Sequence, residues 1–319
     1  MVAKQAHRPR FDVVMPLYNK QAYVETAIRS VLAQGAWLDE LIVVDDGSTD
    51  DGAGIVARLA REYPAIRLLR QANGGVSAAR NRGVLASTAD YVAFLDADDL
   101  YLPGFLKQIA ALAARYPEAG LVGTAYRRFS GDAAHALAQG EPDDSWEGGQ
   151  VPDFFSKWSR GSFITTSSIA VRRQALLDLG GLFPVGERLG EDQDVWFRLA
   201  ERYPVAYSPR QLALYRVDVG GSLTASTALT GVLPCYARLA ERLARGDYPA
   251  RQRRGARRLL GSHYLNMTRQ HAALGDMAGA WRLLADRLAR GNPLYWLRTA
   301  TWLAWRTLTR PQARTGTKA

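Results

Sequence analysis

Two groups of acidic residues are the first candidates for chemistry in this chain. Asp96 and Asp98 are separated only by Ala97 in the stretch YVAFLDADD. Two carboxylates this close repel one another unless a cation or hydrogen-bond donors compensate their charge. Mg²⁺ characteristically binds one or two carboxylates together with substrate phosphates. The pair therefore suits a divalent metal, although a solvated acidic turn is the alternative reading.

The second acidic group is Glu191, Asp192 and Asp194, at the start of the stretch EDQDVW. The dipole of a helix favours carboxylates at its N-terminus, and this accounts for any one of the three. Three acidic residues within four positions exceed what helix capping requires. One of them could serve as a general base, provided that it lies within hydrogen-bond reach of an acceptor hydroxyl.

The elements that would position these residues follow from the apolar pattern. Four short apolar runs that do not alternate with polar residues are typical of strands buried on both faces of a parallel sheet. Segments with helical spacing separate them, which predicts a doubly wound α/β sheet with right-handed crossovers. The expected strands are Phe11–Met15, Leu41–Val44, Ile66–Leu69 and Tyr91–Leu95, and the expected helices are Ala22–Gln34, Gly52–Tyr63 and Val76–Ser87.

The ends of the four strands are the places to look for a ligand, because ligands of such sheets bind beyond the carboxyl ends of the strands. The runs are followed by PLYN, DDGSTD, NGG and DADD. Gly75 and its neighbours would allow the backbone to approach a ligand closely. One polar ending is only a loop, whereas four at one sheet edge predict a site.

The second half of the chain is less regular. Residues 130–152 are rich in Gly, Pro and Asp and are expected to form a loop. Order is expected to return with Ile164–Arg172, a helix over Glu191–Tyr203 and one or two strands over Val205–Val217. From residue 229 the chain becomes helical. We expect a catalytic domain over residues 1–228, with a nucleotide-sugar part at about 11–123 and an acceptor part at about 124–228, and a helical basic region over 229–319.

Composition and charge narrow the class of protein. The chain has 319 residues, of which 47% are hydrophobic, and its one cysteine excludes a disulfide framework. No window of 18 consecutive apolar residues is present, so a cytoplasmic protein is expected, with peripheral contact to the inner face of the membrane left open. The net charge of +10 resides in the C-terminal quarter, where Arg238–Ala319 holds 17 Lys and Arg against four Asp and Glu. Such a region suits an anionic partner or is a set of solvated helix faces.

Five segments together resemble the inverting family-two glycosyltransferases, whose nucleotide-binding α/β fold is called GT-A. They are VVMPLYNK, IVVDDGSTDDG, NGGVSAARNRGV, YVAFLDADD and GEDQDVWFRL, in the family's order and spacing, between about Phe11 and Thr224. Each motif is weak alone, and five in sequence are specific. The resemblance extends to bacterial enzymes that assemble cell-surface polysaccharides. It implies transfer of a sugar from a nucleotide-diphosphate donor, most readily a UDP-sugar, to a hydroxyl of a sugar or a lipid-linked acceptor.

The resemblance also implies a role for each matching residue. Asp98 is implied to bind Mn²⁺ or Mg²⁺, with Asp96 and Asp218 as further candidate ligands. Asp192 is implied as the catalytic base, with Glu191 beside it. Because one displacement with one base inverts the anomeric centre, the enzyme is expected to be inverting. The implied donor site consists of Pro16, Tyr18, Asn19, Asp46, Gly75, Arg80, Asp96, Ala97 and Asp98.

One segment departs from the family pattern. Many relatives carry Tyr-Arg-x-His near the end of the catalytic domain, and here Asp218 stands at the histidine position. An aspartate could still bind a metal, but it would repel a diphosphate. Gly220 to Ser222 are expected to form a lid over the donor. The candidates for the acceptor side and the lid are Thr166, Ser167, Trp196, Arg216 and Ser222, and core packing is the favoured alternative for Trp196.

The C-terminal stretch Asn292–Thr309 separates arginines from a face that bears tryptophan. This pattern suits a helix lying in a membrane surface, and packing on the domain or in a homodimer explains it equally well.

Three rival functions are open. A nucleotidyltransferase would be expected to carry a glycine-rich phosphate loop where this chain has PLYNK, a non-catalytic binding module would not need both Asp98 and Asp192, and a nucleic-acid binder leaves the acidic strand ends unexplained. We therefore expect no nucleic-acid partner.

Overall fold

The computed structural model describes residues 8–138, 148–219, 231–246 and 248–309. The chain divides into two compact units. The first consists of Met1–Phe154 and Ser162–Ala225, and the second consists of Phe155–Gly161 and Ser226–Ala319.

The first unit is built on a curved sheet of nine strands in the described residues. Eight of them follow the order β3-β2-β1-β4-β8-β6-β9-β5, and β7 pairs with β9 beside this path. The strands β1 to β4 are mutually parallel, and β6 and β9 also pair in parallel. The strands β5, β7 and β8 pair antiparallel to their neighbours. The bounds are β1 Phe11–Leu17, β2 Glu40–Asp45, β3 Ile66–Arg70, β4 Tyr91–Phe94, β5 Leu100–Tyr101, β6 Leu121–Phe129, β7 Gly149–Gln150, β8 Ile169–Arg172 and β9 Val205–Arg216.

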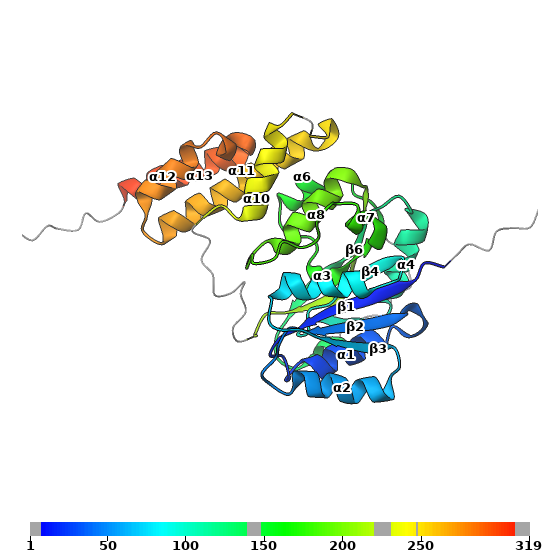
Figure 1. Ribbon diagram of the computed structural model, residues 1–319. Coiled ribbons are helices and arrows are strands. Elements are labelled where there is room, and N and C mark those ends of the chain that lie inside the picture. The colour runs from blue at the N-terminus through cyan, green and yellow to red at the C-terminus, as the bar shows by residue number, and fades with distance from the viewer. Residues whose placement is uncertain (1–7, 139–147, 220–230, 247, 310–319) are drawn as a thin grey trace, which may run out of the picture. The chain divides into compact units, whose positions relative to one another are not determined.

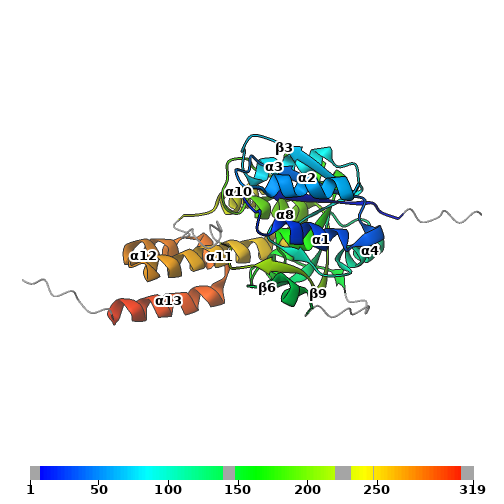
Figure 2. The ribbon, with the colours of Figure 1, turned by 90° about the horizontal axis from the view of Figure 1, so that it is seen from below.

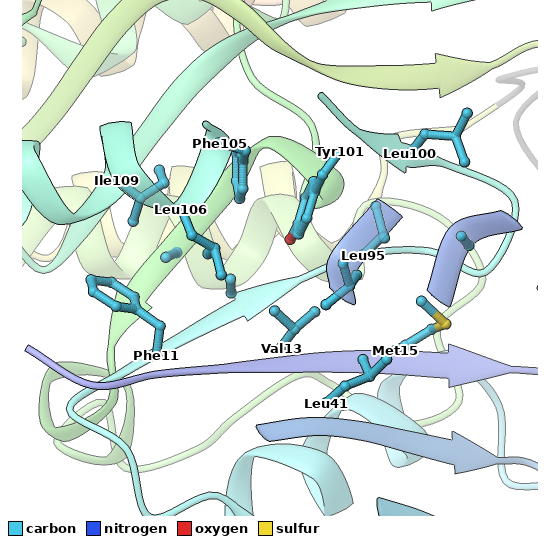
Figure 3. Close-up of a cluster of buried hydrophobic side chains, with 14 of the residues drawn as sticks. Phe11, Val13, Met15, Leu41, Leu95, Leu100, Tyr101, Phe105, Leu106 and Ile109 are labelled. Carbon is cyan, nitrogen blue, oxygen red and sulfur yellow. The ribbon is translucent and has the colours of Figure 1, made fainter. Parts of the chain in front are cut away.

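Helices cover both faces of this sheet, so its central strands are buried on both sides (Figure 1). Phe11, Val13 and Met15 of β1 point into a cluster shared with the helices of one face (Figure 3). Val14, between them in sequence, faces helix α3, where a Cβ on Gly83 would come within 2.3 Å of the Val14 side chain. The helices of this unit are α1 Val24–Leu32, α2 Gly52–Glu62, α3 Val76–Ala86, α4 Phe105–Arg115, α5 Ala133–Ala138, α6 Phe154–Trp158, α7 Arg173–Leu177 and α8 Glu191–Arg202. Helix α6 continues into the second unit after Phe154. Two 3-10 turns lie at Gly35–Trp37 and Thr166–Ser168.

The mixed α/β sheet that the sequence predicts is confirmed, and its four strands lie within two residues of their expected bounds. The expectation of a loop over residues 130–152 is wrong in part. Ala133–Ala138 forms helix α5, because the Asp132 carboxylate accepts a hydrogen bond of 2.9 Å from the Ala134 N–H and alanine is the strongest helix former. Gly149–Gln150 adds a short strand to β9.

The second unit is helical. It contains α10 Pro234–Ala244, α11 Ala250–Ala273, α12 Met277–Ala285 and α13 Pro293–Leu308, with a 3-10 turn at Leu288–Gly291. Proline begins both α10 and α13, at a position where its missing N–H costs no hydrogen bond. The side chain of Asp276 caps α12 by accepting a hydrogen bond from the Gly279 N–H. Across the ranges that the structure describes, no helix has the length and apolar character to span a bilayer.

Candidate active site

The loops after β1 and β2 are tied to each other at the carboxyl edge of the sheet. The amide oxygen of Asn19 accepts hydrogen bonds from the N–H and the hydroxyl of Thr49, at 2.8 and 3.2 Å. In return, the Ser48 hydroxyl accepts one from the Asn19 N–H. Asn19 has a φ of 52°, a left-handed conformation that asparagine tolerates better than most residues. Tyr18 beside it is exposed and Pro16 is partly buried, so an edge of this loop is open to a ligand.

Asp46, at the end of β2, organises the loop between β3 and α3. Its buried carboxylate accepts hydrogen bonds from the Gln71 side chain at 2.7 Å and from the N–H groups of Gly74 and Gly75 at 2.8 Å each. Gly75 has a φ of +86°, which favours glycine there. The place of Asp46 in the donor site stays a prediction, and the structure adds that three donors hold its carboxylate in place.

Arg80 joins the two acidic groups that the sequence singles out. It lies on α3 with its side chain 4% exposed, and its two terminal nitrogens are 2.9 Å from Asp96 Oδ1 and 2.8 Å from Glu191 Oε1. Burial alone would lower the pKa of Arg80, but the charges of Asp96 and Glu191 outweigh it and raise that pKa above its ordinary value. Residues from α3, the loop after β4 and the start of α8 thus form one charged cluster.

Asp98 has a partner of its own. The Lys20 ammonium lies 2.7 Å from Asp98 Oδ2, with both side chains mostly buried. The Ala97 side chain between the two acids is buried, which holds Asp96 and Asp98 at the surface of the loop. The sequence reasoning missed Lys20, and its signal was a cation following the first strand end, at the same sheet edge as the acids.

Asp99 is a second residue that the sequence reasoning missed. It is buried, and its carboxylate accepts hydrogen bonds from the Ser167 hydroxyl at 2.6 Å and from the Arg216 N–H at 2.9 Å. Burial, with the charges of Asp96 and Asp98, raises its pKa well above the ordinary value. The Ser167 oxygen also accepts a hydrogen bond from the Asp96 N–H at 3.1 Å. Asp99 therefore anchors the acidic loop, and the available signal was a third aspartate directly after Asp98.

Glu191 and Asp192 lie in different surroundings, with Glu191 the more buried of the two. Burial, and then the neighbouring charge of Asp192, raise the pKa of Glu191 to about 7 against the opposing effect of Arg80. Asp192 is less buried, and its two oxygens accept hydrogen bonds from the Thr166 hydroxyl at 2.9 Å and from the Gln193 N–H at 2.7 Å. Asp194 has a structural role, since its buried carboxylate binds Arg198 one turn later at 2.8 Å.

The structure places the residues predicted for the acceptor side and the lid in different environments. Thr166 and Ser167 contact Asp192 and Asp99 as described, and Arg216 donates from its side chain to the carbonyl oxygens of Asp98 and Gly131. The role of Trp196 in binding an acceptor is wrong, because its side chain is fully buried between Phe94 and Phe183, with ring centroids 6.0 and 5.7 Å away. Gly220 to Ser222, which were expected to form the lid, lie outside the described residues.

Asp218 is paired with residues outside the acidic loop. Its carboxylate accepts a hydrogen bond from the Gly131 N–H at 2.7 Å, which lowers its pKa, and it lies 3.5 Å from Arg216. Within the described residues, no group of three or more His, Cys, Asp or Glu side chains is arranged to hold a metal ion. Asp96, Asp98 and Asp218 therefore do not form a preassembled three-carboxylate site.

Comparison with known proteins decides the family. The model of the family described as glycosyl transferase family 2 matches residues 12–180, more than half of the chain. The chain belongs to glycosyl transferase family 2. All the residues of the acidic loop and the turn at Thr166–Ser168 lie within the matched range, whereas Glu191 and Asp192 follow it.

Individual relatives support the assignment over shorter ranges. The uncharacterized glycosyltransferase YibD of Escherichia coli is 41% identical over 104 residues, which are 33% of this chain and 30% of YibD. The minor teichoic acid biosynthesis protein GgaB of Bacillus subtilis is 38% identical over 102 residues, 31% of this chain and 11% of GgaB. Each match thus spans a third or less of the relative's length.

The fold is shared with a solved glycosyltransferase. Residues 1–349 of Staphylococcus aureus TarS, crystallised in complex with UDP-GlcNAc, superpose with a TM-score of 0.63 at 17% identity, over 93% of this chain and 81% of the TarS chain. The GT-A fold that the sequence predicts is confirmed.

Proposed function

We propose that this enzyme transfers a sugar from a nucleotide-diphosphate donor to an acceptor hydroxyl in a single, metal-assisted displacement that inverts the anomeric centre. The observation that carries the proposal is the bridge from Arg80 to Asp96 at 2.9 Å and to Glu191 at 2.8 Å. It brings the acidic loop after β4 next to the start of α8. A candidate donor-binding carboxylate and a candidate base therefore lie on adjoining elements.

The residues of the acidic loop fit a divalent ion. Asp98 offers carboxylate oxygens, and its pairing with the Lys20 ammonium at 2.7 Å supports a position that accepts a cation. Mg²⁺ characteristically takes one or two carboxylates and completes its shell with substrate phosphates and water, so Asp98, with Asp96 as a second candidate, would hold Mn²⁺ or Mg²⁺ together with the donor. The bound ion would stabilise the negative charge that grows on the departing diphosphate.

Asp192 has the surroundings that a general base needs. The Thr166 hydroxyl and the Gln193 N–H both donate to its carboxylate, at 2.9 and 2.7 Å, and fix the orientation of that carboxylate. Asp192 would take the proton of the acceptor hydroxyl as that oxygen attacks the anomeric carbon. Glu191 is paired with Arg80 at 2.8 Å and would help to position Asp192. Because Asp192 is the single base in this scheme, the product has the configuration opposite to that of the donor.

Substrates and setting belong to the same proposal. We propose a UDP-sugar as donor, since the TarS structures with the same fold contain UDP-GlcNAc and UDP. Surface polysaccharide or glycolipid synthesis is proposed from the likeness to a teichoic acid biosynthesis protein. The acceptor would be a sugar or a lipid-linked oligosaccharide reached from the cytoplasmic side.

A donor screen tests the proposal. The purified protein is incubated with a panel of UDP-, GDP- and TDP-sugars, with Mn²⁺ or with a chelator, and release of the nucleotide is measured. We expect release from a UDP-sugar that requires the metal and increases with acceptor. NMR of the glycoside product should show inversion. Turnover that survives complete chelation would contradict the metal role, and a retained configuration would contradict the single displacement.

A further inference from the structure

Helix α13 of the second unit exposes an apolar stripe that its own packing does not use. The stripe consists of Leu294, Leu297, Trp305 and Leu308, which are 71, 56, 63 and 85% exposed. Since residues three or four apart, and multiples of this spacing, share a helix face, these four lie along one side of α13. Large apolar side chains scattered singly are normal on a protein surface, but four in one line on a single helix indicate an interaction site.

The opposite side of α13 is fixed to its own unit. Thr299 and Leu303 are fully buried, and the Trp296 ring N–H donates a hydrogen bond of 2.9 Å to the Leu284 carbonyl of α12. The Tyr295 hydroxyl donates to Asn266 of α11 at 2.7 Å. Figure 2 shows α13 lying along α11 and α12 with its other side turned away from both. The expected separation of arginines from a tryptophan-bearing face is wrong in part: Arg298 and Trp305, seven residues apart, are both exposed on one side of α13, while Leu303 packs inward.

The charged residues of α13 are both basic. The helix contains Arg298 and Arg306 and no acidic residue, and Arg298 is exposed on the same side as the stripe. Arg306 and Arg269 also lie over the Trp302 ring, 5.4 and 4.9 Å from its centroid. This stacking holds the tryptophan ring and the guanidinium groups next to each other. Tryptophan together with basic residues is typical of protein segments that lie in the interfacial region of a bilayer.

We propose that this stripe docks on an anionic lipid surface. Apolar side chains would enter the boundary between headgroups and acyl chains, while the arginines meet lipid phosphates. Charge decides against a second copy of the chain as the occupant, because a two-fold interface would place Arg298 and the stripe of one copy against the same basic surface of the other. An anionic bilayer has the opposite charge. Each basic residue near such a surface strengthens binding by about fivefold, and salt screens the effect.

Sedimentation with vesicles tests the proposal on the full-length protein. Wild type is mixed at low salt with vesicles of phosphatidylcholine alone, or of phosphatidylcholine with phosphatidylglycerol, and the pelleted fraction is measured. We expect pelleting only with the anionic vesicles and partial release in high salt. The double variant Trp305→Ser with Leu308→Ser should lose most of the binding, and Arg298→Glu should weaken it at least fivefold.

Matched controls keep the result specific. Leu85→Ser replaces an apolar side chain that is also 63% exposed but lies on α3, and it should pellet as wild type does. All substituted side chains are exposed, so circular dichroism melts should be unchanged. Wild type that ignores anionic vesicles at low salt, or a double variant that binds them as well as wild type does, would overturn the proposal. So would a dimer in light scattering that the double variant converts to monomer. None of these results depends on sugar transfer.

Discussion

The buried bridge at Arg80 makes the strongest quantitative prediction. Arg80→Met keeps the approximate length of the side chain and removes its charge, which leaves Asp96 and Glu191 without their shared partner. Asp96 is partly exposed and can be solvated, whereas the Glu191 side chain is only 11% exposed. Removing one partner of a buried ion pair costs about 3–5 kcal/mol, largely because the other charge stays buried and unpaired. We expect a loss at the lower end of that range at pH 8.

The second substitution separates charge from packing. Adding Glu191→Gln to Arg80→Met removes the uncompensated charge, so the double variant should recover most of the lost stability. A residual loss of about 1 kcal/mol would correspond to the missing hydrogen bonds. The free energy of unfolding is measured by urea titration followed by circular dichroism. Arg58→Met is the matched control, since it breaks an exposed arginine–aspartate pair with Asp51 and should cost less than about 1 kcal/mol.

The pH dependence gives an independent check on the same residues. The pKa of Glu191 is raised from 4.5 to about 7 in the folded protein, so its favourable contribution is complete below pH 4.5 and is lost as pH rises through 7. The loss is on the order of 3 kcal/mol, because each pKa unit corresponds to about 1.4 kcal/mol. Arg80 lowers this pKa, so in Arg80→Met the carboxyl should stay neutral to higher pH. The deficit of the variant should therefore be smaller at pH 5 than at pH 8. An equal deficit at both values, with no recovery from Glu191→Gln, would assign the loss to packing against Phe183.

Three further substitutions test the site. Asp192→Asn should leave donor binding intact in calorimetry and lower turnover by about 10²–10⁴-fold, as for loss of a general base; unchanged turnover would move the role to Glu191. Asp98→Ala should abolish transfer and weaken nucleotide binding when Mn²⁺ or Mg²⁺ is present, but much less in a chelator, and equal weakening under both conditions would contradict a metal contact. Lys20→Met removes the cation that is paired with Asp98. The protein without nucleotide should then bind Mn²⁺ several-fold more tightly, as measured by electron paramagnetic resonance. Unchanged or weaker Mn²⁺ binding would show that the lysine does not compete for that carboxylate.

The strands and crossover helices of the first unit could be predicted because burial on both faces leaves a distinctive pattern. Leu41–Val44 contains no polar residue, and its neighbours on both sides supply turn-forming or acidic residues. The edge at which the acidic residues meet follows from topology, since the carboxyl ends of parallel strands share one edge. Positions in the donor half of the site were therefore accessible from the sequence.

The partners of those residues could not be predicted. Arg80 and Glu191 are separated by 111 positions, and the pattern of neither helix indicates which side chains meet across the sheet edge. Trp196 was assigned to the acceptor side because tryptophan suits both sugar stacking and a core, and helical spacing does not distinguish them. Lys20 and Asp99 were missed for a related reason: each lies beside residues with a named role and gains its own role only through a tertiary contact.

Two separate links join the acidic loop to the start of α8, and together they bear on catalysis. Arg80 is one. The other is the turn at Thr166–Ser168, in which Thr166 donates to Asp192 while Ser167 binds Asp99 and the Asp96 N–H. A single displacement requires the base and the departing diphosphate on opposite sides of the anomeric carbon, and small errors in that alignment slow the reaction severely. Side chains that contact both acidic groups restrict their relative movement before substrate arrives. Under the proposed mechanism, the buried charges near the site would serve to hold this alignment.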